Sequence, residues 1–320
     1  MRARVVWLGL AALLVAGLIA ASTLLGRATI AEETSFTIPA GASLGQVADK
    51  LEAEGLVSSA EGFRLRARLL GSAAPIQAGE FLLTPGMSQG DILAAFQSGD
   101  VIRRFVTIPE GMPSILVWER VMAQDMLTGD VPVPPEGSIL PDTYNFERGE
   151  PRAKLVARMQ AAMKQALAEE WAKRSPGLAV STPEEALILA SIVEKETGKS
   201  EERRMVAGLY SNRVKQGMRL QADPTIIYPI TKGKPLGRRI RQSEIAAVNG
   251  YNTYTRAGLP VGPITNPGRA SIAAVLNPED TDALFMVADG TGGHWFAATL
   301  AEHNANVAKW YAIRRERGEM

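Results

Sequence analysis

The chain has 320 residues, of which 46% are hydrophobic and 22% are charged, a composition typical of packed domains rather than of disordered chains. Its length indicates about two domains. The formal net charge of +1 argues against nucleic acid as a partner, because that partner requires a strongly basic surface. The absence of cysteine excludes disulfides, cysteine-ligated zinc and thiol catalysis.

Residues 5–25 form an uncharged apolar run, with Arg2 and Arg4 before it and Glu32 after it. A bilayer core requires about 20 apolar residues in a helix. We therefore expect a single transmembrane helix, with residues 1–4 as a cytoplasmic tail and the remainder periplasmic or extracytoplasmic, anchored in the inner (plasma) membrane. The alternative is a cleaved signal peptide ending near Ala20-Ala21-Ser22, but the run is long for one.

A loose repeat follows, in which a short β-type run leads into a Pro/Gly turn and then an amphipathic helix. The three copies are SFTIPAGASL at 35–44, FLLTPGMS at 81–88 and FVTIPEGMP at 105–113. Ser43 and Ser88 are suited to cap the helices of the first two copies. Their unequal spacing argues against a solenoid and indicates a small α+β module over about residues 33–100.

The larger remainder, residues 101–320, begins with a Pro-rich loop at 131–135. A helix is predicted over residues 151–173, where Leu155, Met159, Met163 and Leu167 recur every four residues. The next helix starts at Thr182-Pro183, a cap followed by a favoured first-turn proline, and Glu185 is placed to complete a capping box.

This second helix is apolar on nearly every face from Ala186 to Val193, which is typical of a buried helix, and it runs directly into Glu194-Lys195-Glu196. Glu196 shares its helical face with Leu189, Ile192 and Val193, whereas the face of Glu194 carries Ser191 and Ala190. Burial and the negative end of the helix dipole both favour the protonated carboxyl of Glu196. Such a carboxyl suits general acid catalysis of glycosidic cleavage. The alternative is that both glutamates lie on a solvated helix end.

The block LASIVEKET at 189–197 resembles the signature of the YceG-like (MltG) family of endolytic murein transglycosylases. Further blocks resemble that family in the same order: EGSILPDTY at 136–144, SNR at 211–213, MRLQADPT at 218–225, YNTY at 251–254, GLPVGPI at 258–264, NPG at 266–268, GGHWF at 292–296 and EHN at 302–304. Ser138-Ile139 departs from the larger aromatic or aliphatic pair expected there. The stretch IPAGASLGQVA at 38–48 is similar to LysM modules, which bind the glycan of peptidoglycan.

The resemblance implies a membrane-anchored α+β protein with a LysM-like module at 33–100 and a YceG-like catalytic domain at 101–320. It implies a lytic transglycosylase that cuts nascent peptidoglycan strands between MurNAc and GlcNAc, leaves 1,6-anhydroMurNAc ends and so terminates strand elongation beside the peptidoglycan synthases. In the family the second glutamate of the block is catalytic, which corresponds to Glu196. No metal or cofactor is implied.

Other residues are candidates for substrate binding. Asp223 is either a second carboxylate of a hydrolase pair or the start of a turn before Pro224, and Gln221 is a possible partner for sugar hydroxyls. Thr225 belongs to the same block. Asn212 and Arg213 lie on a predicted helix, where Arg213 suits a sugar or a stem carboxylate but alone is as typical of a surface ion pair.

The aromatic and amide side chains of Tyr251, Asn252 and Tyr254 suit sugars, although a strand edge in the core has the same composition. His294 and Phe296 follow a Gly-rich turn, at 289–293, that is more typical of a hairpin than of a phosphate cradle. The spacing of the two histidines does not resemble a zinc site.

Two rival functions remain open at this point. A hydrolytic muramidase would use Asp223 to activate water, and a non-catalytic, membrane-anchored protein would only bind peptidoglycan. In the lyase, one carboxyl serves both proton transfers because the sugar's own hydroxyl is the nucleophile, which relaxes the requirement for a carboxylate pair.

Overall fold

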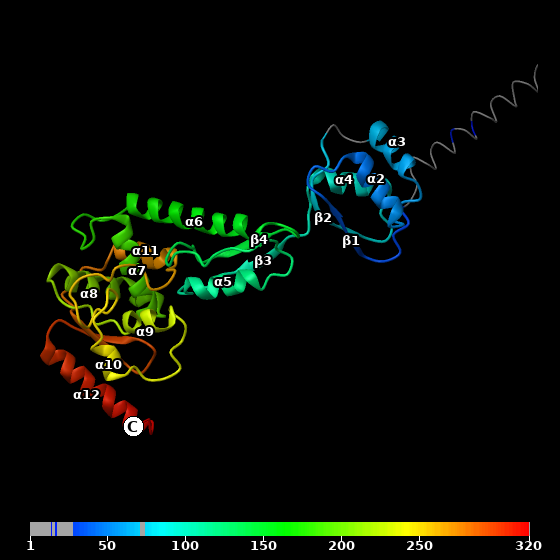
Figure 1. Cartoon of the computed structure of the whole chain (residues 1–320). Helices are drawn as coiled ribbons and strands as arrows, with labels where there is room; N and C mark the ends of the chain where they lie inside the picture. The colour runs from blue at the N-terminus through cyan, green and yellow to red at the C-terminus, as the bar shows by residue number, and fades with distance from the viewer. Residues whose placement is uncertain (1–13, 15–16, 18–27, 71–73, 320) are drawn as a thin grey trace, which may run out of the picture. The chain divides into compact units, whose positions relative to one another are not determined.

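The computed structural model describes residues 14, 17, 28–70 and 74–319, and the described part divides into two compact units at Arg104/Phe105 (Figure 1). Among the described residues, the first unit has one hydrophobic cluster and the second unit has two. The fold of the described residues is α+β, because helices dominate and the strands pair into small two-stranded sheets.

The predicted transmembrane helix is contradicted. Among the described residues, no helix is both long enough and apolar enough to cross a membrane. The segment proposed to span, residues 5–25, lies outside the described residues except for Leu14 and Gly17. An apolar run supplies only the composition of a span, and no such span is found among the observed helices. The expected single-pass placement in the inner membrane, with a cytoplasmic N-terminus, depended on that helix and is therefore not supported either.

The first unit holds β1 (Thr34–Ile38), α2 (Leu44–Ala53), α3 (Ala60–Leu70), β2 (Gly79–Leu83) and α4 (Gln89–Ser98). Strands β1 and β2 are antiparallel, with Phe36 opposite Phe81. Both rings pack on Phe96 of α4, at centroid distances of 5.5 and 4.9 Å. The predicted caps are confirmed, since Ser43 and Ser88 each form a capping box with the residue three positions later.

The second unit carries the catalytic candidates. Its elements are β3 (Arg104–Thr107), α5 (Ser114–Met122), β4 (Thr143–Phe146), α6 (Arg152–Ala172), α7 (Pro183–Glu196), a 3-10 turn (Ser200–Glu202), α8 (Arg203–Lys215), α9 (Pro224–Thr231), α10 (Gln242–Ile245), α11 (Arg269–Leu276), β5 (Phe285–Ala288), β6 (His294–Ala297) and α12 (Leu300–Glu316). Strands β5 and β6 form the predicted hairpin around the turn at 289–293. The predicted helix at 151–173 is confirmed as α6.

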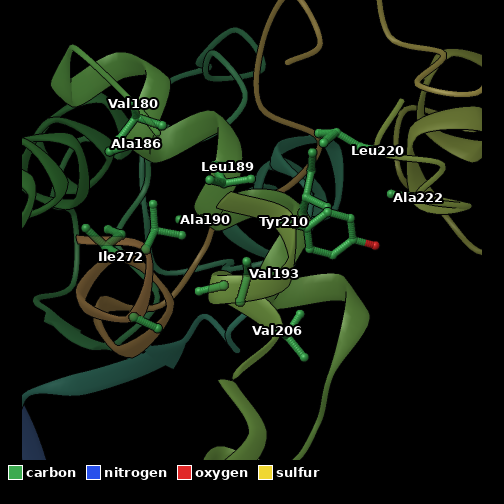
Figure 2. Close-up of a cluster of buried hydrophobic side chains, with 14 of the residues drawn as sticks. Val180, Ala186, Leu189, Ala190, Val193, Val206, Tyr210, Leu220, Ala222 and Ile272 are labelled. Atoms are coloured by element: carbon green, nitrogen blue, oxygen red, sulfur yellow. The ribbon is translucent and has the colours of Figure 1, made fainter. Parts of the chain in front are cut away.

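Helix α7 lies at the centre of the core of this unit, packed against α8 and α11. Figure 2 shows Leu189, Ala190 and Val193 of α7 within the cluster that also holds Val206 of α8 and Ile272 of α11. All five side chains are fully enclosed. The prediction of a helix buried on nearly every side is therefore confirmed.

The start of α7 differs in one detail from the expectation. Thr182 caps the helix by accepting from the Glu185 amide at 3.1 Å, and Pro183 occupies the first turn. The Glu185 carboxylate instead accepts from the Ser181 amide at 2.6 Å, one residue before the cap. The reciprocal half of the predicted capping box is thus displaced by one residue.

Helix α8 approaches the chain after α11 very closely, at Gly208. A Cβ atom on Gly208 would lie 2.6 Å from the carbonyl oxygen of Glu279 and 2.8 Å from the Thr281 side chain. Four residues later, the Asn212 amide donates to the carbonyls of Thr281 and Ala283, at 2.7 and 3.2 Å. Glycine at 208 therefore sets the separation of α8 from this loop.

We expect Gly208→Ala to destabilise the second unit. Pushing backbone away costs about 1–3 kcal/mol, which exceeds the gain of about 1 kcal/mol that alanine brings to a helix interior. Urea unfolding followed by tryptophan fluorescence measures the difference. Gly198→Ala is the matched control, because a Cβ there meets nothing within 4 Å, and its stability should stay within about 0.5 kcal/mol of the parent. Equal stabilities of the two variants would contradict the packing argument.

Candidate functional site

A cavity of about 240 Å³ lies where the end of α7 meets α8, the start of α9 and strand β5. Its polar lining combines two carboxyl groups, two phenols, one guanidinium and one amide. The residues that line it are Glu196, Leu209, Tyr210, Arg213, Leu220, Gln221, Asp223, Tyr254 and Met286. Five of the residues predicted from the sequence, Glu196, Arg213, Gln221, Asp223 and Tyr254, are brought together here.

Glu196 is the last residue of α7, and the backbone leaves the helix at Thr197 in an extended conformation. Its side chain is enclosed by protein except where it faces the cavity, and it keeps partial exposure there. Desolvation by burial, reinforced by the negative charge of Asp223, raises the pKa of Glu196 to about 7. A hydrogen bond with Tyr210 and the charge of Arg213 act in the opposite direction but do not cancel the effect.

Glu194, the other acid of the block, has a different environment. Its carboxylate accepts from the Gly268 amide at 2.9 Å and from the Ser271 hydroxyl at 2.7 Å, at the start of α11. Burial raises its pKa, while these two hydrogen bonds favour the charged form. An anion at a helix N-terminus is stabilised by the unpaired amides there. Glu194 therefore fixes α11 to the end of α7 and does not line the cavity.

Asp223 lines the same cavity as Glu196, and its carboxylate accepts a hydrogen bond from a phenol. Its Oδ1 atom accepts from the Tyr254 hydroxyl at 2.6 Å. Burial raises the pKa of Tyr254, and the neighbouring Asp223 carboxylate raises it further. The phenol thus stays protonated and remains a donor to Asp223 at neutral pH.

Gln221 forms an exposed rim of the cavity in a backbone conformation that is unusual for a residue with a side chain. Its φ of 54° is in the left-handed region. The conformation is held by the backbone N–H of Gln221, which donates to the backbone carbonyl of Thr253 at 3.2 Å. A non-glycine residue kept in this region beside a cavity marks Gln221 as a candidate functional residue.

Arg213 is buried, at 8% exposure, and its donors go to carbonyls rather than to a carboxylate. Nε donates to Leu284 at 2.6 Å, and Nη1 donates to Leu220 at 2.6 Å and to Arg219 at 3.3 Å. Its charge acts on Glu196 across the cavity. The expected alternative of a surface ion pair does not apply, and a positive charge faces the site.

Tyr210 is a lining residue that the sequence argument did not select. It is almost fully enclosed, and burial raises its pKa well above the ordinary value. The signal that points to it is its spacing, because residues three apart share a helical face and Tyr210 lies three before Arg213.

The remaining predicted residues lie outside the cavity and support its walls. Thr225 is buried and shares a 2.8 Å hydrogen bond with Thr253, which joins α9 to the chain that carries Tyr254. Asn252 is fully buried, donates to the carbonyls of residues 244, 245 and 247, and accepts from the Tyr254 amide at 2.9 Å. Asn212 binds the loop after α11, as described above.

Three aromatic candidates are also directed elsewhere. Tyr251 packs on Tyr228 with ring centroids 4.8 Å apart. His294 places Nδ1 2.8 Å from the Glu202 carboxylate, and its amide donates to the same group at 3.0 Å. Phe296 packs against the core of the unit. Sequence reasoning therefore identified the neighbourhood but overestimated how many of its side chains line the cavity.

Within the described residues, no three His, Asp or Glu side chains converge in the manner of a metal site. The chemistry that this arrangement itself offers is proton transfer. A carboxyl that titrates near neutral pH faces a carboxylate and a guanidinium across a small polar cavity.

Comparison of the chain with known proteins identifies a matching family, named relatives and a similar solved structure. Residues 36–309 match the YceG-like family. The endolytic murein transglycosylase of Bacillus subtilis (strain 168) is 29% identical over 317 residues, which cover 88% of this chain and 86% of the relative. The endolytic murein transglycosylase of Streptococcus pneumoniae serotype 2 (strain D39) is 28% identical over 322 residues, 85% of this chain but 57% of the relative. The crystal structure of a putative YceG-like protein from Listeria monocytogenes has 27% identity and a TM-score of 0.52, and the match covers 86% of this chain and 99% of that one.

The raised pKa of Glu196 predicts a pH-dependent stability cost. The folded state holds its proton up to about pH 7, whereas the unfolded state releases it near 4.5. Glu196 therefore destabilises the fold progressively as pH rises between these values. We expect Glu196→Gln to become more stable relative to the parent by about 1–3 kcal/mol between pH 5 and pH 8.

Urea unfolding at several pH values between 5 and 8 measures this gap. The control is Glu201→Gln, a substitution of an exposed glutamate on the next turn, whose stability relative to the parent should not change over the same range. A gap for Glu196→Gln that stays constant with pH would show that the carboxyl titrates normally.

Proposed function

The chain belongs to the YceG-like family, and from that membership we propose that it is an endolytic murein transglycosylase that cuts the glycan strands of peptidoglycan. The relatives that cover most of its length carry that name. The reaction is a lyase reaction between MurNAc and GlcNAc that leaves a 1,6-anhydro end. The observation that supports it best in the structure is the Glu196 carboxyl, protonated up to about pH 7 and directed into the polar cavity.

Glu196 acts as the general acid in the first step. Its proton passes to the oxygen that bridges MurNAc and GlcNAc, the bond from C1 to that oxygen breaks, and positive charge develops at C1 and the ring oxygen. A carboxyl with a pKa near the working pH is suited to this transfer because it is protonated yet acidic enough to donate. The Asp223 carboxylate on the other wall stabilises the developing positive charge.

In the second step the resulting Glu196 carboxylate acts as the base. It takes the proton of the C6 hydroxyl of the same MurNAc, and that oxygen bonds to C1 to form the anhydro ring. The proton lost in the first step is regained in the second, so the enzyme is unchanged and no water is consumed. One carboxyl is sufficient, since the nucleophile belongs to the substrate.

The other lining residues take supporting roles in this proposal. Gln221 and Arg213 bind polar groups of the sugars from the rim and the floor of the cavity, and Tyr254 orients Asp223. Tyr210 positions the Glu196 carboxyl and limits the rise of its pKa. Asn212, Thr225, Tyr251, Asn252, His294 and Phe296 hold the walls rather than the substrate.

The first unit supplies a second point of contact with the glycan. Its order β1–α2–α3–β2 and the stretch at 38–48 support a LysM-like module. A mostly apolar cavity of about 340 Å³ lies between the start of α2, which includes Leu44, and the chain before β2, which includes Ile76. Apolar surface of this kind suits the faces of sugar rings. The finer parts of the function, cleavage of nascent strands and action beside peptidoglycan synthases, rest on the family resemblance.

The products of digestion test the lyase directly. Purified peptidoglycan is treated with the protein and the released glycan is analysed by mass spectrometry. We expect anhydro ends, lighter by one water than reducing ends. Glu196→Gln should lower the rate by about 10²–10⁴-fold, the range that a positioned acid–base group contributes, whereas the exposed control Glu201→Gln should match the parent.

Each other outcome identifies a rival function. Reducing ends would indicate a hydrolytic muramidase and would assign the activation of water to Asp223, which lines the same cavity. Absence of products together with retained binding to peptidoglycan would favour a non-catalytic binding protein.

The rate should fall as pH rises through about 7, because the general acid loses its proton there. This decline in rate is the alkaline limb of the pH profile. Substitutions of two residues near Glu196 should shift the pH of this limb in opposite directions. Asp223→Asn removes a charge that raises the pKa, so the limb moves to lower pH. Tyr210→Phe removes a hydrogen bond that lowers the pKa, so the limb moves to higher pH.

The measurement is kcat/KM between pH 5 and pH 9, with Asp280→Asn, an exposed aspartate beside a different cavity, as the control. Shifts of the same sign in Asp223→Asn and Tyr210→Phe would rule out the assignment of the limb to Glu196.

A further inference from the structure

The loop between α9 and α10, yellow in Figure 1, is strongly basic. Residues 232–244 contain Lys232, Lys234, Arg238, Arg239 and Arg241, but only one acid, Glu244. The chain as a whole is close to neutral, with a formal charge of +1. This loop therefore carries a local excess of positive charge.

Part of this charge is neutralised within the protein. Lys234 forms an ion pair with Glu119 of α5, and Arg238 forms a two-pronged pair with Glu244, with contacts at 2.5 and 2.9 Å. Arg241 also interacts electrostatically with the Glu244 carboxylate. Within the part of the chain that the structure describes, Lys232 and Arg239 form no ion pair, and both are exposed. These two cations are available to an external anion.

The loop is firmly held at both ends. At its start, Gly233 is so close to Pro113 that a Cβ atom would lie 2.7 Å from the proline side chain. At its end, the buried amide of Asn252 binds the carbonyls of residues 244, 245 and 247, at distances from 2.7 to 3.3 Å. The two free cations are thus presented from an ordered support.

Both ends of the loop also lead to the cavity. Helix α9 starts immediately after Asp223 and ends one residue before Lys232. At the other end, Asn252 accepts from the Tyr254 amide, and the Tyr254 hydroxyl donates to Asp223. The basic loop therefore extends from two walls of the cavity that holds Glu196.

We propose that this loop binds the carboxylates of the peptide stems, and that the enzyme therefore prefers stem-bearing glycan to bare glycan. The proposal rests on the function proposed above. A strand stripped of its stems keeps one lactyl carboxylate on each MurNAc, close to the sugar ring, whereas each stem carries further free carboxylates that extend away from the ring. Exposed lysine and arginine favour such anions by charge complementarity.

The dimensions agree with this assignment. The eight residues of α9 span about 12 Å at 1.5 Å per residue. An extended stem of five residues reaches about 17 Å at 3.3–3.6 Å per residue. A stem attached to a MurNAc unit in the cavity is thus long enough to reach Lys232 and the residues that follow.

The test compares two substrates and two pairs of substitutions. The substrates are defined glycan strands made from stem-bearing precursors, free of phosphate polymers, and the same strands after enzymatic removal of the stems. The variants are Lys232→Gln with Arg239→Gln, and the control Lys154→Gln with Lys164→Gln, which removes two exposed cations of α6. The KM and kcat values for each substrate are measured at low and high salt.

We expect the loop variant to raise KM for stem-bearing strands about 3–10-fold, as two exposed charge pairs would, with kcat unchanged. Its KM for stem-free strands and both values for the control should match the parent. The preference of the parent for stem-bearing strands should diminish at high salt, since exposed charges are screened. Equal effects on the two substrates, or no effect on either, would overturn the proposal.

A binding arm separates this inference from the proposed function. Both pairs of substitutions are introduced into the Glu196→Gln variant, and binding to stem-bearing and stem-free strands is measured by sedimentation. This measurement does not depend on cleavage. Stem-dependent binding that the loop substitutions abolish supports the basic loop even if the parent yields no anhydro products. Absence of products from the parent would count against the transglycosylase alone, and stem-independent binding would count against the loop.

Discussion

The structure depends on one unfavourable arrangement, a carboxyl group placed at the end of a helix that the core surrounds. The side chains of α7 from Leu189 to Val193 are excluded from water, and their burial stabilises the unit by roughly 1.5–3 kcal/mol for each large aliphatic residue. That stabilisation offsets the cost of desolvating one acid. The raised pKa of Glu196 is thus a consequence of how α7 packs, and the same packing holds the carboxyl in a fixed position.

Helix α8 completes the site because one of its sides lines the cavity and the other contacts the loop after α11. One side carries Tyr210 and Arg213 to the cavity, where they moderate the pKa of Glu196. The other side carries Gly208 and Asn212, which hold the loop after α11. That loop leads into β5, and the carbonyl of Leu284 accepts from Arg213. A displacement of α8 would therefore move the phenol and the guanidinium together.

The sequence was sufficient wherever the deciding contacts are local. Helical spacing identified the buried helix and separated Glu196 from Glu194, and cap residues located the starts of α2, α4 and α7. Long-range partners were not accessible in this way. The sequence suggested that the Asn252 amide binds sugar, but in the structure it donates to backbone carbonyls seven and eight residues away. His294 pairs with Glu202, which is 92 positions away in the sequence. The apolar N-terminal run had the composition of a membrane span, but composition alone did not establish a spanning helix.

The pairing of Asp223 with Tyr254 bears on which reaction the cavity favours. A carboxylate that activates water needs an oxygen that is free to accept the proton. Asp223 Oδ1 already accepts from the Tyr254 hydroxyl at 2.6 Å, so this oxygen is occupied. Glu196 lies in the same cavity, and its raised pKa keeps it protonated up to about pH 7. A fixed negative charge beside a single proton carrier suits a reaction in which charge develops at C1 and the substrate provides its own nucleophile.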